Sequence, residues 1–389
     1  MNFDEPGDFA VIRDEVRRLC SRYPGEYWQG LEPDRYPTEF VTDLAEHGWL
    51  GTLIPTDYGG GGLSLAGASV ILEEIAASGA NPSACHAQMY VMGALVRHGS
   101  ETQKRRWLPE IAAGRTRMQA FGVTEPAAGS DTASITTRAV RDGDGWTLSG
   151  QKIWTSRALH SDLMLVLART TPAPDAERRF DGLSIFIFEM RHAGGELVDG
   201  LTIRPIPTMM NHNSTEVFFD NVRLPADALV GTEGKGFSHI LDGMNAERIL
   251  IAAECVGDGR FFCERAAAYA TERVVFGRPI GQNQGVAFPL ARAYAAIEAA
   301  SLMRFKAAGL FDAGKPCGPE ANMAKLLASE ASWAAGNAAV DTFGGFGFAT
   351  EYDIERKLRE TRLYQVAPVS NNLVLAYVAR QCLGLPKSY

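Results

Sequence analysis

Two short segments of this 389-residue chain combine small residues, hydroxyl groups and an indole in a way that suits a flat aromatic ligand. In "FGVTEPAAGSD" (121–131), small side chains let backbone amides approach a ligand closely, while Thr124 and Ser130 add hydroxyl groups. In "GQKIWTSR", Trp154 and Ser156 stand two residues apart, which predicts that they share one face of a strand. An indole beside a hydroxyl group can form the wall of a cofactor site, although a single Trp in a strand is more often a core residue.

A third candidate is an acid inside an apolar helix. The segment "LDGMNAERILIAAECVG" (241–257) is apolar on nearly every side of a helix, and Glu247 lies among Met244, Ile249 and Leu250. Burial of a carboxylate without a partner or a function costs free energy. Two interpretations follow: Glu247 is a general base, or it pairs with a basic side chain at a domain interface.

The spacing of apolar residues predicts the elements that position these groups. From about Phe9 to Gly114 the spacing is helical, and from about Met118 to Val230 it changes to the period of two that is typical of strands. The strongest strand candidates are 145–155, 162–170, 182–190, 201–208 and 215–225. Helical spacing then returns in four long segments: 236–274, 285–313, 319–343 and 352–383. We therefore predict a helical domain at 1–117, a β domain at 118–231 and a four-helix domain at 232–389.

Composition excludes several classes of protein. With 46% hydrophobic and 22% charged residues the chain is an ordinary globular protein, and its net charge of −8 argues against a nucleic-acid partner. The six cysteines form no CxxC pair, so neither a metal site nor a disulfide framework is predicted. The sequence has no uninterrupted run of about 18 apolar residues, so membrane insertion is not predicted. The N-terminal segment lacks the apolar region of a secretory signal, so we expect a cytoplasmic protein.

Five motifs in order resemble the acyl-CoA dehydrogenase family over nearly the whole chain. They are the two segments above, "FDNVRLP" (219–225), "ERVVFGRPIGQNQ" (272–284) and "FGGFGFATEYDIERKLRETR" (343–362). The resemblance implies an α+β fold with an N-terminal helical domain, a central β-barrel-like domain and a C-terminal four-helix bundle. It also implies FAD held between these domains, in a protein that is usually a homotetramer.

The resemblance assigns flavin contacts to the first two motifs. The segment with Phe121, Val123 and Thr124 is similar to the one that lines the flavin ring. Ser130 resembles a residue near the pyrophosphate and the CoA arm. Trp154 resembles the residue that packs on one flavin face, and Ser156 takes the place of the hydroxyl residue that meets flavin N5.

Other motifs resemble the family's contacts with the rest of FAD. Three residues resemble those that a neighbouring subunit offers to the diphosphate and adenine: Arg273, Phe276 and Gln284. A guanidinium suits a diphosphate, and a Phe ring suits an adenine plane. Gly344 and Gly345 match the pair that lets backbone lie against the cofactor. Asp341 departs from the family pattern, because a Gln commonly contacts FAD there and an acid would repel a diphosphate.

The position of the base is a second departure. Many relatives carry a glutamate base near the end of the chain, and alignment without a gap places Pro368 there. Glu247, immediately before Arg248, instead resembles the base of isovaleryl-CoA and long-chain relatives, and Arg248 is then an orienting cation. Pro368 also lacks the N–H that relatives use to bind the thioester oxygen, so a dehydrogenase needs a substitute donor, such as the N–H of Val369 or the hydroxyl of Ser370. A structural role for Pro368, as the first residue of the final helix, is compatible with this interpretation.

These assignments predict an FAD-dependent enzyme that converts an acyl-CoA thioester to a trans-2-enoyl-CoA. The predicted partner that takes the electrons is an electron-transfer flavoprotein. Two alternatives stay open: a catalytically silent FAD-binding partner subunit of a hetero-oligomer, and a flavin oxidase or monooxygenase on the same scaffold.

Overall fold

The chain folds into two compact units, each built from segments that are distant in sequence. The computed structural model describes residues 7–175 and 177–386. Unit 1 contains residues 1–32, 63–82 and 245–389, and unit 2 contains residues 33–62 and 83–244. The first six residues of the segment that we searched for a signal, and the last three of the predicted terminal domain, lie outside the described part. The three domain boundaries that we expected along the sequence stay a prediction.

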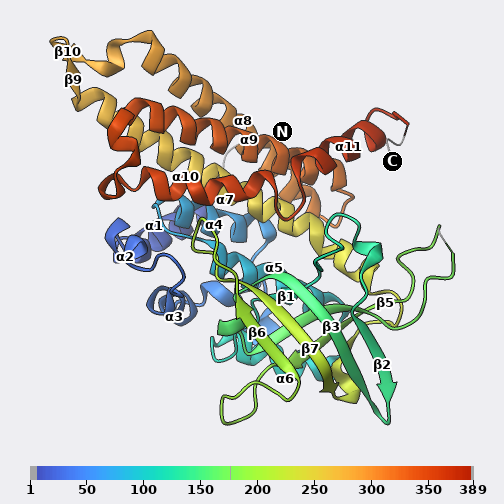
Figure 1. Ribbon diagram of the computed structural model, residues 1–389. Helices are drawn as coiled ribbons and strands as arrows, with labels where there is room; N and C mark the ends of the chain where they lie inside the picture. The colour runs from blue at the N-terminus through green and yellow to red at the C-terminus, as the bar shows by residue number, and fades with distance from the viewer. Residues whose placement is uncertain (1–6, 176, 387–389) are drawn as a thin grey trace. The chain divides into compact units, whose positions relative to one another are not determined.

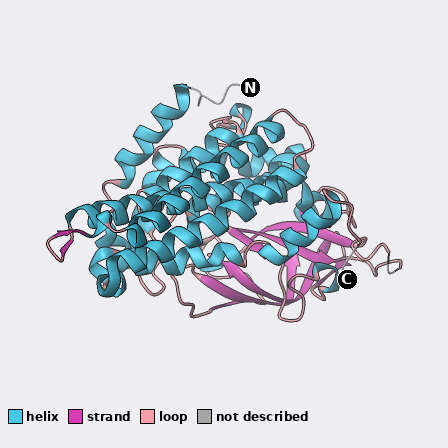
Figure 2. Cartoon of the chain, turned by 90° about the horizontal axis from the view of Figure 1, so that it is seen from above, coloured by secondary structure: helices cyan, strands magenta, loops and turns pink. Residues whose placement is uncertain are grey.

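Unit 1 is mainly helical, and unit 2 holds the sheet (Figures 1 and 2). The elements of unit 1 are α1 (Gly7–Cys20), α2 (Gly25–Gly30), α4 (Leu65–Ala77), α7 (Gly236–Glu272), β9 (Val274–Val275), β10 (Arg278–Pro279), α8 (Gln284–Asp312), α9 (Gly318–Phe343), α10 (Ile354–Arg362) and α11 (Asn371–Gln381). The residues of α7 up to Met244 belong to unit 2. The other elements of unit 2 are α3 (Thr38–Glu46), α5 (Ser83–His98), α6 (Glu101–Ala112), β1 (Ala120–Gly122), β2 (Arg138–Asp142), β3 (Gly145–Ser156), β4 (Leu163–Arg169), β5 (Leu183–Glu189), β6 (Leu201–Pro205), β7 (Ser214–Leu224) and β8 (Leu229–Val230).

The sheet of unit 2 is mixed and open. Its strands follow the order β6-β7-β3-β2-β4-β5-β8, and β1 pairs in parallel with β4. Among the described strands the end strands β6 and β8 do not pair with each other, so the sheet does not close into a full barrel. The expected order of a helical region, a β region and a helical region is confirmed, as are the five predicted strands.

Strand β4 divides the core of unit 2 into two layers. Leu165 and its alternate neighbours pack in a cluster with Leu95 of α5 and Leu108 of α6. Val166 and its alternate neighbours pack instead with Val217 of β7 and other residues of the sheet. Because both faces of β4 are covered, the strand is apolar throughout, whereas a strand with one face open to solvent would alternate apolar and polar residues.

The last predicted helix of unit 1 is in fact two helices. The expected segment 352–383 breaks between α10 and α11, because Pro368 lacks an N–H and disfavours a helical residue before it. The expectation that Pro368 begins the final helix is also wrong. Helix α11 begins at Asn371, and Ser370 is its N-cap, whose Oγ accepts the N–H of Leu373 at 3.4 Å. A short hydroxyl side chain satisfies an unpaired N–H at a helix start, which a proline side chain cannot do.

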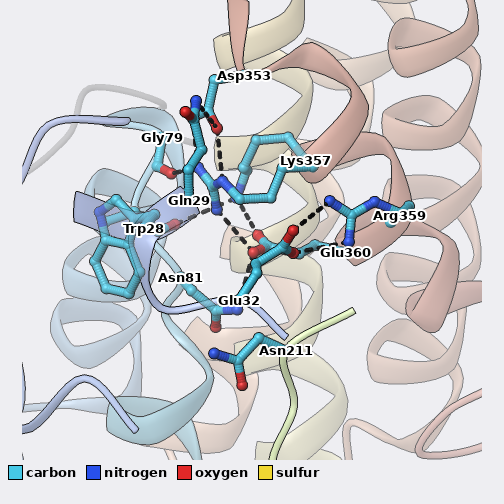
Figure 3. Close-up of polar contacts among 12 residues, drawn as sticks. Trp28, Gln29, Glu32, Gly79, Asn81, Asn211, Asp353, Lys357, Arg359 and Glu360 are labelled. Atoms are coloured by element: carbon cyan, nitrogen blue, oxygen red, sulfur yellow. Dashed lines mark hydrogen bonds and ion pairs between the residues drawn. The ribbon is translucent and has the colours of Figure 1, made fainter. Parts of the chain in front are cut away.

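A buried ionic network fixes α10 within unit 1 (Figure 3). The Lys357 ammonium lies 2.6 Å from Oδ1 of Asp258 and 3.1 Å from Oε2 of Glu360. Arg359 donates two hydrogen bonds of 2.7 Å to the carboxylate of Glu32. The network positions the start of the segment 363–370, which carries the departure at Pro368.

Helix α8 is long and apolar enough to cross a membrane by length and composition alone, and 28% of its most apolar window is buried. Such a helix is weak evidence for a membrane protein. The fully buried Arg304 of α8 forms an ion pair with the fully buried Glu73 of α4. A buried ion pair in the middle of this helix is typical of a helix packed within a protein.

Candidate active site

The segment predicted to line the flavin begins at strand β1 in unit 2. Ala120, Phe121 and Gly122 pair with β4, so this segment is held by main-chain hydrogen bonds to a buried strand. A Cβ atom at Gly122 would come within 2.5 Å of the end of the Met164 side chain, so a larger residue would require that side chain to move. Phe121, Val123 and Thr124 are half-buried. Their position at the end of β1 leaves part of each side chain accessible to a ligand.

A buried ion pair braces the same segment from behind. The ammonium of Lys152, which is fully buried, donates to the carbonyl oxygen of Val123 and to Oε1 of Glu125, both at 2.9 Å. Glu125 also accepts the backbone N–H groups of Thr136 at 2.6 Å and Thr137 at 2.9 Å. Burial by itself raises the pKa of the Glu125 carboxyl, but Lys152 and these donors outweigh burial and lower the pKa to about 2. Glu125 therefore braces its loop.

We expect this pair to make stability depend on pH in acid solution. Because the pKa of Glu125 falls from 4.5 in the unfolded chain to about 2 in the folded protein, its contribution is present above pH 4.5 and is lost as the pH falls toward 2. The difference in melting temperature between the wild type and Glu125→Gln should therefore shrink across this window. Thermal unfolding followed by circular dichroism at a series of pH values measures it. A difference that stays constant from pH 6 to pH 2 would contradict the assignment.

A bulge alters the expected geometry of Trp154 and Ser156. The pairing of β3 with β7 shifts between Lys152 and Thr155, and Trp154 has a φ of 60°. The prediction that Trp154 and Ser156 share one face of a regular strand is therefore wrong, because the extra residue of the bulge interrupts the period of two. The Trp154 side chain is 55% exposed and Ser156 is half-buried, whereas Thr155 between them is buried. Trp154 is thus not a core residue, and its indole is accessible.

The loop that follows the flavin motif is held by charges. Ser130 is exposed, and its neighbour Asp131 accepts hydrogen bonds from Arg179 at 2.7 Å and from the hydroxyl of Ser134 at 2.6 Å. These donors, with Ser134 first, lower the pKa of Asp131. Asp131 therefore shapes the loop that presents Ser130.

In unit 1, Glu247 lies on α7 at the edge of a buried stretch. It is half-buried, whereas Ile249 and Leu250 are fully buried, so it is less enclosed than the apolar pattern predicted. Nη1 of Arg248 donates to Oδ1 of Asn245 at 3.3 Å. Burial lowers the pKa of the Arg248 guanidinium, and the nearby charges of Glu247 and Tyr377 act in the opposite direction. The Glu247–Arg248 pair thus stands at the border between the helical core and solvent.

The segment around Pro368 is anchored to helix α9. The ammonium of Lys325 donates to the carbonyl oxygen of Val369 and to Oδ1 of Asn371, both at 2.7 Å. The hydroxyl of Ser329 also donates to Oδ1 of Asn371, at 3.2 Å. Arg248 acts electrostatically on Lys325, so the predicted base and this segment belong to the same part of unit 1. Val369 and Ser370 are both half-buried.

The residues predicted to reach a neighbouring subunit lie on or beside a hairpin of unit 1. Strands β9 and β10 are joined by Phe276 and Gly277, with φ of 53° and 80°, as a tight two-residue turn requires. The Phe276 side chain is completely exposed, at 101% of its reference area. Arg273 and Gln284, on either side of the hairpin, are exposed as well. The hairpin therefore presents an aromatic ring to solvent in the single chain.

The glycine pair follows the end of α9. Gly344 has a φ of 60°, which only glycine adopts without strain, and no atom lies within 4 Å of where its Cβ would be. Gly345 is equally open. Asp341, in the last turn of the helix, is exposed, so its carboxylate is in contact with solvent.

Comparisons with known proteins agree with this arrangement of parts. Three family models match, described as acyl-CoA dehydrogenase N-terminal, middle and C-terminal domains, over residues 8–115, 120–222 and 234–383. Acyl-CoA dehydrogenase fadE12 of Mycobacterium bovis is 38% identical over 394 residues, covering 100% of this chain and 99% of its own length. The chain belongs to the acyl-CoA dehydrogenase family. The enzymes of this family are flavoprotein oxidoreductases that act on CH–CH bonds, so the predicted family and enzyme class are confirmed.

Solved structures support the same assignment to the acyl-CoA dehydrogenases. A glutaryl-coenzyme A dehydrogenase in complex with glutaryl-CoA has a TM-score of 0.91 and 31% identity, covering 100% of this chain and 98% of that chain. The FAD complex of PigA has a TM-score of 0.90 and 26% identity, covering 99% of this chain and 100% of that chain. Both neighbours share the fold over nearly their full length.

The residues of this acyl-CoA dehydrogenase fit FAD. The accessible indole of Trp154 offers an aromatic face, and the open backbone at Gly344 and Gly345 leaves room for a diphosphate or ribityl group. Arg273 is an exposed cation suited to the diphosphate, and the exposed Phe276 ring is suited to adenine. When bound, FAD supplies a hydride acceptor.

Two lysines of the site were not predicted from the sequence. Lys152 lies in the strand run "GQKIW", where alternation with Trp146 and Leu148 indicates an inward position. Lys325 begins a polar stripe with Ser329 and Ser332 at spacings of four and three residues in an alanine-rich helix. A buried lysine on a stripe of hydroxyl residues is a signal for a specific hydrogen-bonding role. That signal was available from the sequence alone.

Proposed function

We propose that this chain is an FAD-dependent dehydrogenase that converts an acyl-CoA thioester to the trans-2-enoyl-CoA, with Glu247 as the base. The observation that carries the proposal is the position of Glu247. It is a half-buried acid beside Arg248, in the part of unit 1 that holds the segment around Pro368. The proposal places the chain in the subtype whose base lies on the first helix of the C-terminal domain.

Each remaining residue has a role in binding or orientation. Glu247 takes the proton from the α-carbon of the acyl group. Arg248 orients the Glu247 carboxylate, and Thr124 and Ser156 donate hydrogen bonds that orient the flavin. Ser130 lies near the CoA arm. Trp154 covers one flavin face and excludes water from it.

Anaerobic titration with a panel of straight, branched and cyclic acyl-CoAs tests the proposed function. Purified protein that is yellow and loses its flavin absorbance near 450 nm with at least one member of the panel supports it. Protein that binds no FAD, or that keeps its absorbance with every acyl-CoA, supports a silent partner subunit instead. Pro368 and Asp341 are the specific observations that favour that second candidate. Rapid oxygen consumption with peroxide release during turnover would indicate an oxidase.

We also propose that the active form is a homotetramer that passes its electrons to an electron-transfer flavoprotein in the cytoplasm. The exposed apolar side chains of unit 1 support an assembly, because Phe276, Phe288 and Leu302 are at least half exposed in the single chain. Reoxidation of the reduced enzyme by a purified electron-transfer flavoprotein tests the partner. Failure of reoxidation with a range of such flavoproteins would count against it.

The hairpin tip yields a separate prediction. Phe276→Ala should lower the affinity for FAD by about tenfold to a hundredfold, because one aromatic stacking contact contributes about 1–3 kcal/mol. Equilibrium dialysis against FAD measures the affinity, and sedimentation velocity reports the assembly. The matched control is Phe180→Ala, since Phe180 is also exposed but lies in unit 2. Equal FAD affinity in wild type and Phe276→Ala would remove Phe276 from the cofactor site.

A further inference from the structure

Lys325 is a buried cation whose hydrogen bonds go to neutral groups. It is fully buried, and its two hydrogen bonds end on the carbonyl oxygen of Val369 and the amide oxygen of Asn371. The charged or titratable groups that act on it are Cys255 and Arg248 of α7 and Glu330 of α9. Burial lowers the pKa of Lys325 to about 8, so most of its side-chain amine is still protonated at pH 7. A buried charge held only by neutral oxygens is costly unless it has a specific role.

The hydrogen bond to Val369 fixes the direction of the next N–H group. The peptide bond between Val369 and Ser370 is planar and trans, so its C=O and N–H point in opposite directions. Because Lys325 binds the C=O from the buried side, the N–H of Ser370 points away from the bundle core. Ser370 is half-buried, and its hydroxyl oxygen is occupied as the acceptor for Leu373. The segment therefore presents the Ser370 N–H outward as a fixed donor.

The dehydrogenation requires such a donor. Removal of the α-proton places negative charge on the thioester oxygen, and preorganised donors stabilise that charge. Pro368 cannot supply an N–H at the position where relatives do. Ser370 is two residues further along the same anchored segment, and a neighbouring ammonium strengthens the donor by polarising its peptide group.

We propose that Lys325 is the positioning residue for the thioester oxygen: by holding the Val369 carbonyl, it turns the Ser370 N–H outward to donate in place of the N–H that Pro368 lacks. This inference rests on the proposed dehydrogenation. It assigns to α9 the positioning of the donor for the thioester oxygen, whereas the Glu247–Arg248 pair of α7 removes the α-proton.

The test uses the FAD-loaded enzyme and a 3-oxoacyl-CoA whose acyl chain matches the best substrate. The enolate of such a ligand gives a long-wavelength charge-transfer band against oxidised flavin, so the pH midpoint of the band reports the acidity of the bound α-proton. Lys325→Met should raise the midpoint by about one pH unit, a tenfold loss of acidity, and lower kcat by roughly tenfold to a hundredfold with little change in KM. Lys306→Met, at an exposed position of α8, is the matched control and should change neither. An unchanged midpoint in Lys325→Met would overturn the proposal.

A second pair of variants isolates the N–H group, and decides the question if Lys325→Met does not fold. Ser370 has a φ of −62°, which proline adopts. Ser370→Pro deletes both the N–H and the hydroxyl, whereas Ser370→Ala deletes only the hydroxyl, so the difference between the two variants reports the N–H. Ser370→Pro should raise the midpoint by about one unit, and Ser370→Ala should raise it much less. Equal shifts in both variants would assign the donor to the hydroxyl and overturn the proposal.

Failure of this inference is distinguishable from failure of the proposed function. A wild type that is bleached by acyl-CoA and forms the charge-transfer band retains the proposed function whatever the variants do. A wild type with neither property overturns the proposed function, and the role of Lys325 with it.

Discussion

Replacing Glu247 by Gln should slow flavin reduction by an acyl-CoA about a thousandfold, because a positioned general base contributes on the order of 10²–10⁴ to a rate. Glutamine has nearly the same shape as glutamate but cannot accept the α-proton at neutral pH. Anaerobic stopped-flow at the flavin absorbance maximum measures the effect in a single turnover. The amount of bound FAD should not change, because Glu247 is not among the residues assigned to FAD.

The matched control for this variant is Glu264→Gln. Glu264 lies on the same helix, α7, but is exposed. Its replacement should leave the rate of flavin reduction within about twofold, since exposed substitutions seldom disturb a fold. A normal rate in Glu247→Gln would assign the proton to another group.

Replacing Glu73 by Gln should have the largest effect on stability. Glu73 is fully buried on α4 and forms ion pairs with three guanidinium groups: Arg13, Arg260 and Arg304. Burial alone raises the pKa of its carboxyl, but the three cations, Arg304 first, lower the pKa to about 2. Loss of the carboxylate leaves Arg304 buried without its counter-charge, which costs about 3–5 kcal/mol. Urea unfolding at pH 7 measures the lost free energy.

An exposed ion pair provides the control for the Glu73 experiment. Glu110 binds Arg115 at 2.7 Å, but both side chains are largely accessible to solvent. Glu110→Gln should leave the free energy of unfolding nearly unchanged, because water screens exposed pairs. Equal losses in the two variants would contradict the account of Glu73 as a buried charge centre.

Periodicity of the sequence predicted the elements well and their interruptions poorly. The strands of unit 2 and the helices α7, α8 and α9 lie close to the expected segments, because a covered strand or helix needs apolar residues at a fixed period. The break between α10 and α11 was missed, since apolar spacing continues across Pro368. The bulge at Trp154 was missed for a related reason: one extra residue in a strand leaves no mark on composition.

The candidate site was predictable at the level of residue types but not at the level of their partners. The residue pattern indicated Trp154 and Glu247, and the resemblance to the family indicated Phe276. Neither indicated that Lys152 holds Val123 or that Lys325 holds Val369. Both contacts join residues far apart in the chain, and only the fold brings them together.

Transfer of the α-proton to Glu247 can be measured without any hydride transfer. An acyl-CoA whose β-carbon carries three alkyl carbons besides the α-carbon, such as 3,3-dimethylbutyryl-CoA, has α-hydrogens but no β-hydrogen, so the bound thioester can only exchange its α-hydrogen with solvent. In D₂O, the wild type should incorporate deuterium at the α-carbon, followed by NMR, and Glu247→Gln should incorporate it about a thousandfold more slowly. Equal rates of incorporation in the two proteins would contradict the account.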